Sequence, residues 1–154
     1  MTNLSIMLLI SHRANLNGRN PKTENSPDAI DAAISLRYDV EVDVWYDNGK
    51  WFLGHDKPTY AIGFDWLAMR DKRLWVHCKN IDAMTQLHGL PIHHFWHEND
   101  TLTLTSRGII WAYPGKQPIK RSIAVLPEIH NDSVDGCIGI CSDVIHSYGR
   151  YSNK

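Results

Sequence analysis

The chain has 154 residues, of which 43% are hydrophobic and 21% charged, and its formal net charge is −1. This size and composition predict one globular domain over residues 1–154 and give no electrostatic reason to expect nucleic acid or an anionic membrane as a partner. The 3 cysteines show no C-x-x-C spacing. That pattern argues against a disulfide framework or a cysteine zinc site and favours a reducing cytoplasm.

The first predicted element is a strand in the apolar run Leu4–Ile10. No positive charge precedes this run and it leads straight into Ser11-His12-Arg13, so we expect a strand rather than a signal peptide. No run approaches the ~18 apolar residues of a membrane span. Residues 14–25 are rich in Asn, Gly and Pro, which predicts a loop. Ser26 as N-cap and Pro27 at the first helical position then begin a helix with an apolar stripe.

Strands and helices alternate over the middle of the chain. A strand is predicted over residues 39–46, and Asn48-Gly49 is a strong hairpin signal leading into residues 51–53. A short helix over 62–70, a strand over 73–79 and a helix over 81–88 follow. This alternation favours βα units around a parallel sheet.

The second half contains short apolar segments that are separated by too few residues for full helices. Strands are predicted within 93–98, 108–115, 122–128 and 136–143. A complete eightfold barrel usually needs ~250 residues. We therefore expect an α/β fold, namely a minimal or truncated TIM-like (β/α) barrel with shortened helices in its C-terminal half. Such a barrel leaves sheet edges or apolar faces uncovered, and a homodimer is one way to cover them.

Two carboxylates stand side by side on the strand predicted over 39–46. Glu41 and Asp43 alternate with valines, so both side chains lie on one side of the strand, roughly 6.5 Å apart. They can converge on one hard cation, and without a cation their repulsion raises one pKa. A solvent-facing edge strand with ordinary acidic residues is the alternative. His12, Asp43 and Lys79 each end a predicted strand, which is where parallel α/β folds gather functional residues.

Four motifs occur in a fixed order, namely His12-Arg13, Glu24-Asn25-Ser26, Glu41-Val42-Asp43 and His55-Asp56. This order resembles the signature of the glycerophosphodiester phosphodiesterase family, which is His-Arg-Gly, Pro-Glu-Asn-Thr, Glu-x-Asp and His-Asp. The match is tight over about residues 10–56 and looser to about residue 80. Two positions depart from the family pattern, since Ala14 replaces the glycine after His-Arg and Thr23 stands in place of the proline.

The resemblance implies a TIM-barrel phosphodiesterase that uses one divalent cation, Mg²⁺, Ca²⁺ or Mn²⁺, and acts on a small-molecule phosphodiester. It implies that Glu41 and Asp43 bind the metal and that His12 and His55 perform acid–base chemistry. It also implies that Arg13 contacts the phosphate. Glu24 would be an active-site carboxylate near the metal.

A larger departure lies in the segment Leu74 to Asn80. The family carries an acid two residues before a lysine on its third strand, and that acid is the third metal ligand; the matching positions here are His77 and Lys79. Period-two geometry puts both on one face, so His77 can face the metal and Lys79 the phosphate. A neutral imidazole removes one negative charge and broadens the metal preference toward Mn²⁺, Co²⁺ or Zn²⁺. Alternatively, His77 is a core histidine and water is the third ligand.

Two other functions stay open at this point. One is a non-catalytic module that keeps the phosphate pocket without turnover. The short barrel and His77 raise this possibility, whereas the presence of both His12 and His55 argues against it, because binding alone needs neither an acid nor a base. The other is a lyase or transferase that forms a cyclic phosphate in the same pocket. Glu128 and Asp143 end later strands and are further candidates for the pocket, as are Trp111 and Tyr113 for an apolar wall that packs on the substrate.

Overall fold

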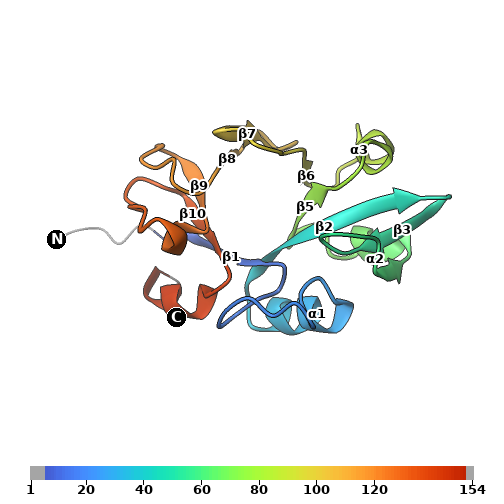
Figure 1. Ribbon diagram of the computed structural model, residues 1–154, viewed down its shortest axis with the longest axis horizontal. Coiled ribbons are helices and arrows are strands. Elements are labelled where there is room, and N and C mark those ends of the chain that lie inside the picture. The colour runs from blue at the N-terminus through green and yellow to red at the C-terminus, as the bar shows by residue number, and fades with distance from the viewer. Residues whose placement is uncertain (1–5, 152–154) are drawn as a thin grey trace.

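The computed structural model describes residues 6–151, which form a mixed α/β fold with short helices (Figure 1). The elements in chain order are β1 (Leu8–His12), α1 (Pro27–Ser35), β2 (Asp39–Asp47), β3 (Lys50–Leu53), β4 (Tyr60–Ile62), α2 (Phe64–Ala68), β5 (Leu74–Cys78), α3 (Ile81–Leu87), β6 (His94–Phe95), β7 (Leu102–Leu104), β8 (Ile110–Ala112), β9 (Ser122–Val125), the 3₁₀ helix η1 (Pro127–Ile129), β10 (Gly139–Ser142) and the 3₁₀ helix η2 (Ile145–Tyr151). Within the described residues, all three α-helices precede β6.

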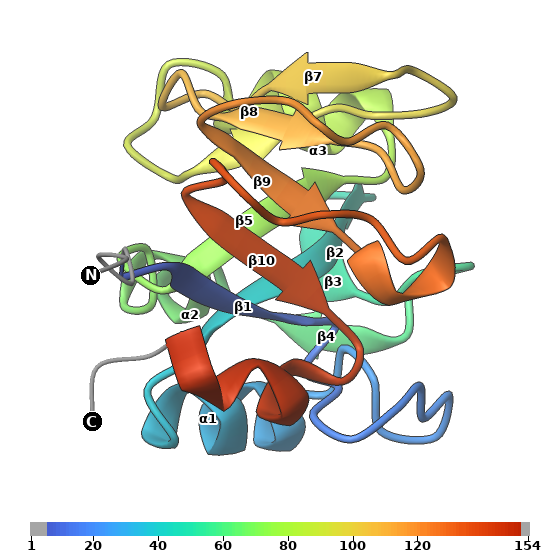
Figure 2. The ribbon, with the colours of Figure 1, turned by 90° about the vertical axis from the view of Figure 1, so that its left-hand side faces the viewer.

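The parallel strands follow one another around a curled sheet in the order of the chain. Their spatial order is β6-β5-β2-β1-β10-β9-β8, so the last strand, β10, pairs with the first, β1. Strands β3 and β4 extend β2 as an antiparallel hairpin, and β7 pairs with β8 in the antiparallel direction. Figures 1 and 2 show the strands curving around one centre, with α1 and η2 outside the curl.

The two ends of the curl meet at β6 and β7 without a ladder between them in the described chain. Several hydrogen bonds cross this seam, among them one from the Ser106 amide to the His94 carbonyl at 2.8 Å and one from the Thr103 hydroxyl to the Trp96 carbonyl at 3.0 Å. The strand pairing of residues 6–151 thus gives a curled half-barrel sheet rather than a ring closed by ladders.

Apolar side chains pack on both faces of this sheet. On the outer face, Ile30 and Ala33 of α1 and Ala83 and Leu87 of α3 belong to a cluster that packs the helices onto the strands. Another cluster contains strand residues only, and three of its members also line the main cavity; it consists of Ile10, Trp75, Phe95, Trp111, Ile123, Val125 and Cys141. Burial on both faces explains the continuous apolar runs of the parallel strands.

The structure confirms the helix cap and the hairpin turn that were predicted from short sequence motifs. Ser26 caps α1 by accepting a hydrogen bond from the Ala29 amide at 3.2 Å. Asn48 and Gly49 turn the β2–β3 hairpin with φ of 48° and 77°. The predicted loop over 14–25 is present. The first predicted strand, Leu4–Ile10, corresponds to β1 from Leu8 onward, while its residues Leu4 and Ser5 lie outside the described residues.

The later strands are shorter than their apolar segments suggested. The segment 93–98 supplies only the two residues of β6, and β4 and β7 were not predicted.

Cys78, Cys137 and Cys141 are buried free thiols. Among the helices of residues 6–151, none has the length and hydropathy needed to cross a membrane.

Candidate functional site

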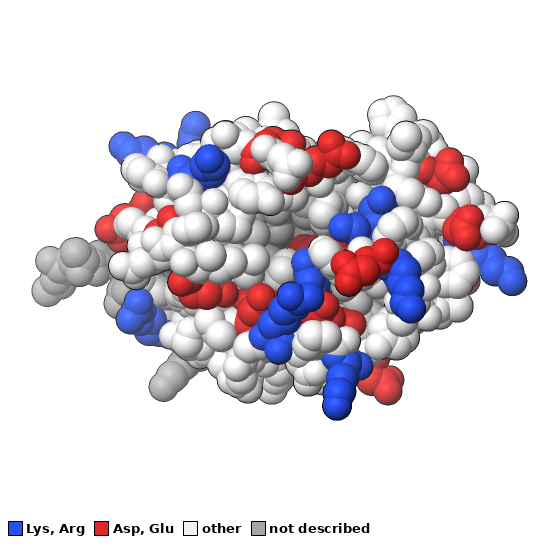
Figure 3. Space-filling model, viewed as in Figure 1, with Lys and Arg blue, Asp and Glu red and all other residues white. Residues whose placement is uncertain are grey.

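The carboxyl ends of the parallel strands surround a cavity of about 420 Å³. Charged and imidazole side chains from the first half of the chain form one part of its lining, namely His12, Arg13, Glu41, His55, His77 and Lys79. Aromatic residues of the second half form another part: Phe95, Trp96, Trp111 and Tyr113. Figure 3 shows the hollow on this face, with acidic and basic side chains along its rim.

A three-residue cluster at this cavity has the composition of a metal site. Glu41 and Asp43 come from β2, and His77 lies opposite Asp43 on the neighbouring strand β5. One ligand atom of each residue lies within 4.8 Å of the others, and His77 Nδ1 is 3.2 Å from Asp43 Oδ1. Glu41 and Asp43 are only 2% and 1% exposed. Glu41 Oε2 and Asp43 Oδ1 find no hydrogen-bond partner among the described residues.

The two carboxylates of this cluster differ in their electrostatics. Burial, followed by the charge of Asp43, raises the pKa of Glu41. Burial alone would raise the pKa of Asp43 as well, but its contacts with His77, Arg13 and Asn25 outweigh burial and lower that pKa. Glu41 is therefore the carboxylate whose ionised form the protein alone compensates less fully, since His12, His77 and Arg13 do not outweigh its burial and the charge of Asp43.

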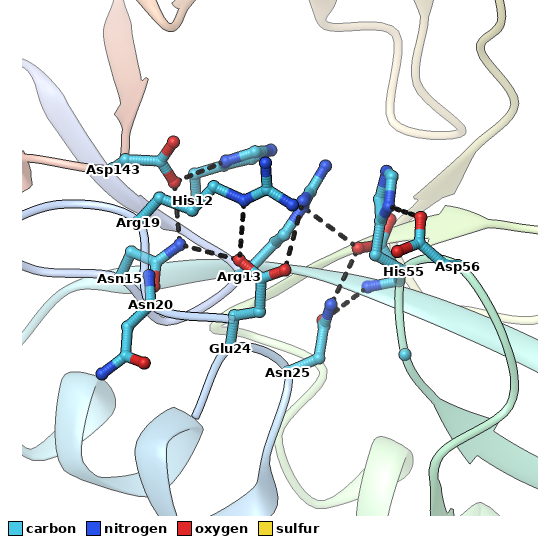
Figure 4. A network of polar contacts seen from close by, with 12 residues as sticks. His12, Arg13, Asn15, Arg19, Asn20, Glu24, Asn25, His55, Asp56 and Asp143 are labelled. Carbon is cyan, nitrogen blue, oxygen red and sulfur yellow. Dashed lines mark hydrogen bonds and ion pairs between the residues drawn. The ribbon is translucent and has the colours of Figure 1, made fainter. Parts of the chain in front are cut away.

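His12 is held between two carboxylates at the end of β1. Its Nδ1 lies 2.8 Å from Asp143 Oδ1, and its Nε2 lies 3.5 Å from Glu41 Oε2. The Asn15 amide donates to the same Asp143 oxygen at 2.9 Å, which fixes the position of that carboxylate (Figure 4). Burial lowers the pKa of His12, but Glu41 and Asp143 outweigh it and raise the pKa overall. With Nδ1 directed at Asp143, Nε2 is the atom available to the cavity.

Arg13 joins the metal cluster to Glu24. Its Nε lies 3.4 Å from Asp43 Oδ2, and its Nη1 lies 3.5 Å from Glu24 Oε1. The other carboxylate oxygen of Glu24 accepts a hydrogen bond from Asn15 at 3.4 Å and lies 3.7 Å from Arg19 Nε. Glu24 is not part of the cavity lining within residues 6–151. The geometry thus places Glu24 behind Arg13, where it orients the guanidinium.

His55 and Lys79 line the same cavity from two other strand ends. His55 Nδ1 lies 2.7 Å from Asp56 Oδ1, and burial and the charge of Arg13 lower the pKa of His55. Gly54 precedes it with φ of 148°, and an added Cβ would come within 2.2 Å of the Lys57 carbonyl oxygen. Only glycine fits this turn. The turn carries His55 into the cavity.

Sequence reasoning missed the role of Asn25. This residue is fully buried, and its amide donates to Asp43 Oδ2 at 2.8 Å while its own oxygen accepts from the Asp43 backbone amide at 2.9 Å. Its φ is 61°, and Arg13 and Ala14 also have positive φ, of 55° and 67°. The only sequence signal was its place beside Glu24 in the second motif. Asn25 thus holds Asp43 through Oδ2 and the backbone amide and leaves Oδ1 to the contact with His77 Nδ1.

The weaker candidates divide between the cavity and its support. Trp111 and Tyr113 line the cavity, as an apolar wall requires. Asp143 is not part of the lining that residues 6–151 form, but it contacts His12, which is. Glu128 accepts hydrogen bonds from the Ser142 hydroxyl at 2.9 Å and from the Asp143 amide at 3.3 Å, so it supports the end of β10.

The site thus combines three side chains that could hold a cation with two basic side chains, Arg13 and Lys79, and the imidazoles of His12 and His55. Such a set suits chemistry on a phosphate ester. The resemblance of the four motifs to a known family stays a prediction, as do the metal and the reaction. No protein-family model matches the chain, and neither a curated protein nor a solved structure matches it.

Proposed function

We propose that this protein is a metal-dependent phosphodiesterase that hydrolyses a small phosphodiester. One observation carries the proposal: Glu41 and Asp43 present buried oxygens without hydrogen-bond partners in the described chain, directly beside the cavity that Arg13, His55 and Lys79 also line. Buried polar atoms in native proteins are normally satisfied, and an ion is one of the recognised explanations for exceptions.

The donor set fits one divalent cation. The two carboxylates would balance its double positive charge and the imidazole would add a neutral donor, while Asn25 and Arg13 hold Asp43 through its other oxygen, Oδ2. When bound, the cation supplies Lewis acidity to a phosphoryl oxygen.

The other side chains have separable tasks in the proposed reaction. Arg13 and Lys79 bind the phosphate as a charge-assisted clamp and stabilise the additional negative charge of the transition state. One of the two histidines, His12 or His55, takes the proton of the attacking hydroxyl, and the other donates a proton to the leaving alkoxide. The attacking group is water, or a neighbouring hydroxyl of the substrate that first gives a cyclic phosphate.

The arrangement of the strands supports a truncated TIM-like barrel as the scaffold. The parallel strands follow chain order around the curl and return to β1, and the site lies at their carboxyl ends, as in barrel enzymes. Together with the four ordered motifs, this supports a short, divergent member of the glycerophosphodiester phosphodiesterase family. A single domain, a homodimer and a cytoplasmic location stay predictions.

The test is a panel of phosphodiesters, each assayed with Mg²⁺, Ca²⁺, Mn²⁺, Co²⁺ or Zn²⁺ after metal removal, with products identified by phosphorus NMR. We expect turnover with at least one metal and its loss in Glu41→Gln and Asp43→Asn. Asp47→Asn makes the same charge change at the exposed end of β2 and should keep full activity. If the wild type binds an unreactive diester but turns over none, the protein is a binding module. A cyclic product would identify a lyase.

A further inference from the structure

The hydrogen bonding of His77 determines which of its ring nitrogens faces the acidic pair. Its Nε2 lies 3.1 Å from the backbone carbonyl oxygen of His97. A carbonyl oxygen only accepts hydrogen bonds, so Nε2 carries the proton and donates it. In the neutral imidazole the lone pair is then on Nδ1, the atom that lies 3.2 Å from Asp43 Oδ1 and 3.9 Å from Glu41 Oε1.

In that tautomer Nδ1 has no hydrogen to donate to the carboxylates. It lies 3.2 Å from Asp43 Oδ1, an atom with no aligned hydrogen-bond donor in residues 6–151. When His77 is neutral and no ion is bound, three electron-pair donors, two of them on buried carboxylates, therefore face one another. A cation between them converts this repulsion into coordination.

The imidazole is also fixed in place before any ion arrives. Its ring stacks on Phe95 with centroids 5.2 Å apart and an interplanar angle of 8°, and the side chain of His77 is 15% exposed. A metal-bound histidine in proteins almost always donates its other ring N–H to a carbonyl or carboxylate, which fixes the tautomer and raises the basicity of the ligand. The His97 carbonyl provides that acceptor.

We propose that His77 Nδ1 is the third ligand of this site and makes the site selective for first-row transition-metal ions such as Mn²⁺, Co²⁺ and Zn²⁺ over Mg²⁺ and Ca²⁺. The proposal rests on the metal site of the proposed function and specifies its cofactor class. Mg²⁺ and Ca²⁺ take oxygen ligands almost exclusively, whereas imidazole nitrogen suits the later divalent ions.

The experiment measures ion binding in metal-stripped protein without any substrate. Co²⁺ is titrated by its visible absorption, and Mg²⁺ and Ca²⁺ are measured by competition against it. The variants are His77→Asp and His77→Glu, which supply an oxygen ligand, with His146→Asp as the control. His146 pairs with the Tyr38 hydroxyl and is not part of the cavity lining in the described residues.

We expect the wild type to bind Co²⁺ more tightly than Mg²⁺ or Ca²⁺ by roughly 10²-fold or more, and His77→Asp or His77→Glu to lower that ratio by at least roughly tenfold. His146→Asp should leave the ratio unchanged. An unchanged ratio in both His77 variants, or a wild type that prefers Mg²⁺ or Ca²⁺, would overturn the inference. Selective Co²⁺ binding without phosphodiester turnover would refute the proposed function alone, and turnover with unselective binding would refute the inference alone.

Discussion

Glu41→Gln should change the stability of the protein in opposite directions with and without metal. Glu41 is 2% exposed, and its Oε2 lacks a hydrogen-bond partner in the described chain. A buried acceptor in that state costs about 1–3 kcal/mol. The neighbouring charge of Asp43 also disfavours the ionised form of Glu41 and raises its pKa. Without metal, the neutral glutamine should therefore stabilise the fold by about 1–2 kcal/mol, or by roughly 2–8 °C in Tm for a chain of this size.

With metal the order should reverse. A ligand at about 100 times its Kd stabilises the folded state by about 2.7 kcal/mol, and the variant loses most of that gain with one of its ligands. The assay is thermal unfolding at pH 8, in EDTA and then in a series of divalent ions. Asp47→Asn should show the wild-type response to metal. The reasoning fails if no divalent ion stabilises the wild type, or if metal stabilises Glu41→Gln equally.

Three further predictions concern single side chains. The kcat/KM of the proposed reaction should pass through a maximum as pH rises, because His55, whose pKa is lowered, would be the base and His12, whose pKa is raised, the acid. His55→Ala should remove the acidic limb of this profile and His12→Ala the basic limb, and each variant should lose roughly 10²–10⁴-fold in rate. Burial lowers the pKa of His93 from 6.5 to about 4, so protonation of this histidine favours the unfolded chain. The free energy of unfolding, measured by chemical denaturation, should therefore be highest above pH 6.5 and fall by about 3 kcal/mol toward pH 4, and His93→Gln should reduce this dependence on pH. Asn25→Asp, which cannot donate to Asp43, should weaken metal affinity by roughly 10–100-fold in calorimetry, whereas Asn20→Asp on the same loop should not.

The sequence predicted the parts of the fold that local chemistry determines. The Ser26 cap, the Asn48-Gly49 turn and the alternating valines of β2 each act over a few residues, and each appears where it was expected. The two-residue β6 and the seam beside it depend on how distant strands meet. Tertiary packing determines how long these strands are and where they pair, so local sequence patterns do not predict either.

The candidate site divides in the same way. Glu41 and Asp43 share a face because of strand period, and that much could be predicted from the sequence. Asp143 contacts His12 although the two residues are 131 positions apart in the sequence. Asn25 donates to Asp43 from a backbone conformation with positive φ, which the sequence pattern did not indicate. These contacts require the curled sheet to bring strand ends together. For the same reason, sequence alone could not place Glu24 behind Arg13.

The division of the cavity between the two halves of the chain has a consequence for protein engineering. The groups proposed to bind metal and phosphate lie between His12 and Lys79, whereas the aromatic wall comes from residues 95–113. Libraries that vary Trp96 and Tyr113 would therefore change the shape offered to the organic part of a diester while leaving the reactive centre in place. His97 should be kept out of such libraries, because its ring lies beside the His77 ring with centroids 5.7 Å apart, on the same residue whose backbone carbonyl accepts from His77. Substitutions in the wall should therefore change which diester the proposed reaction accepts without changing its chemistry.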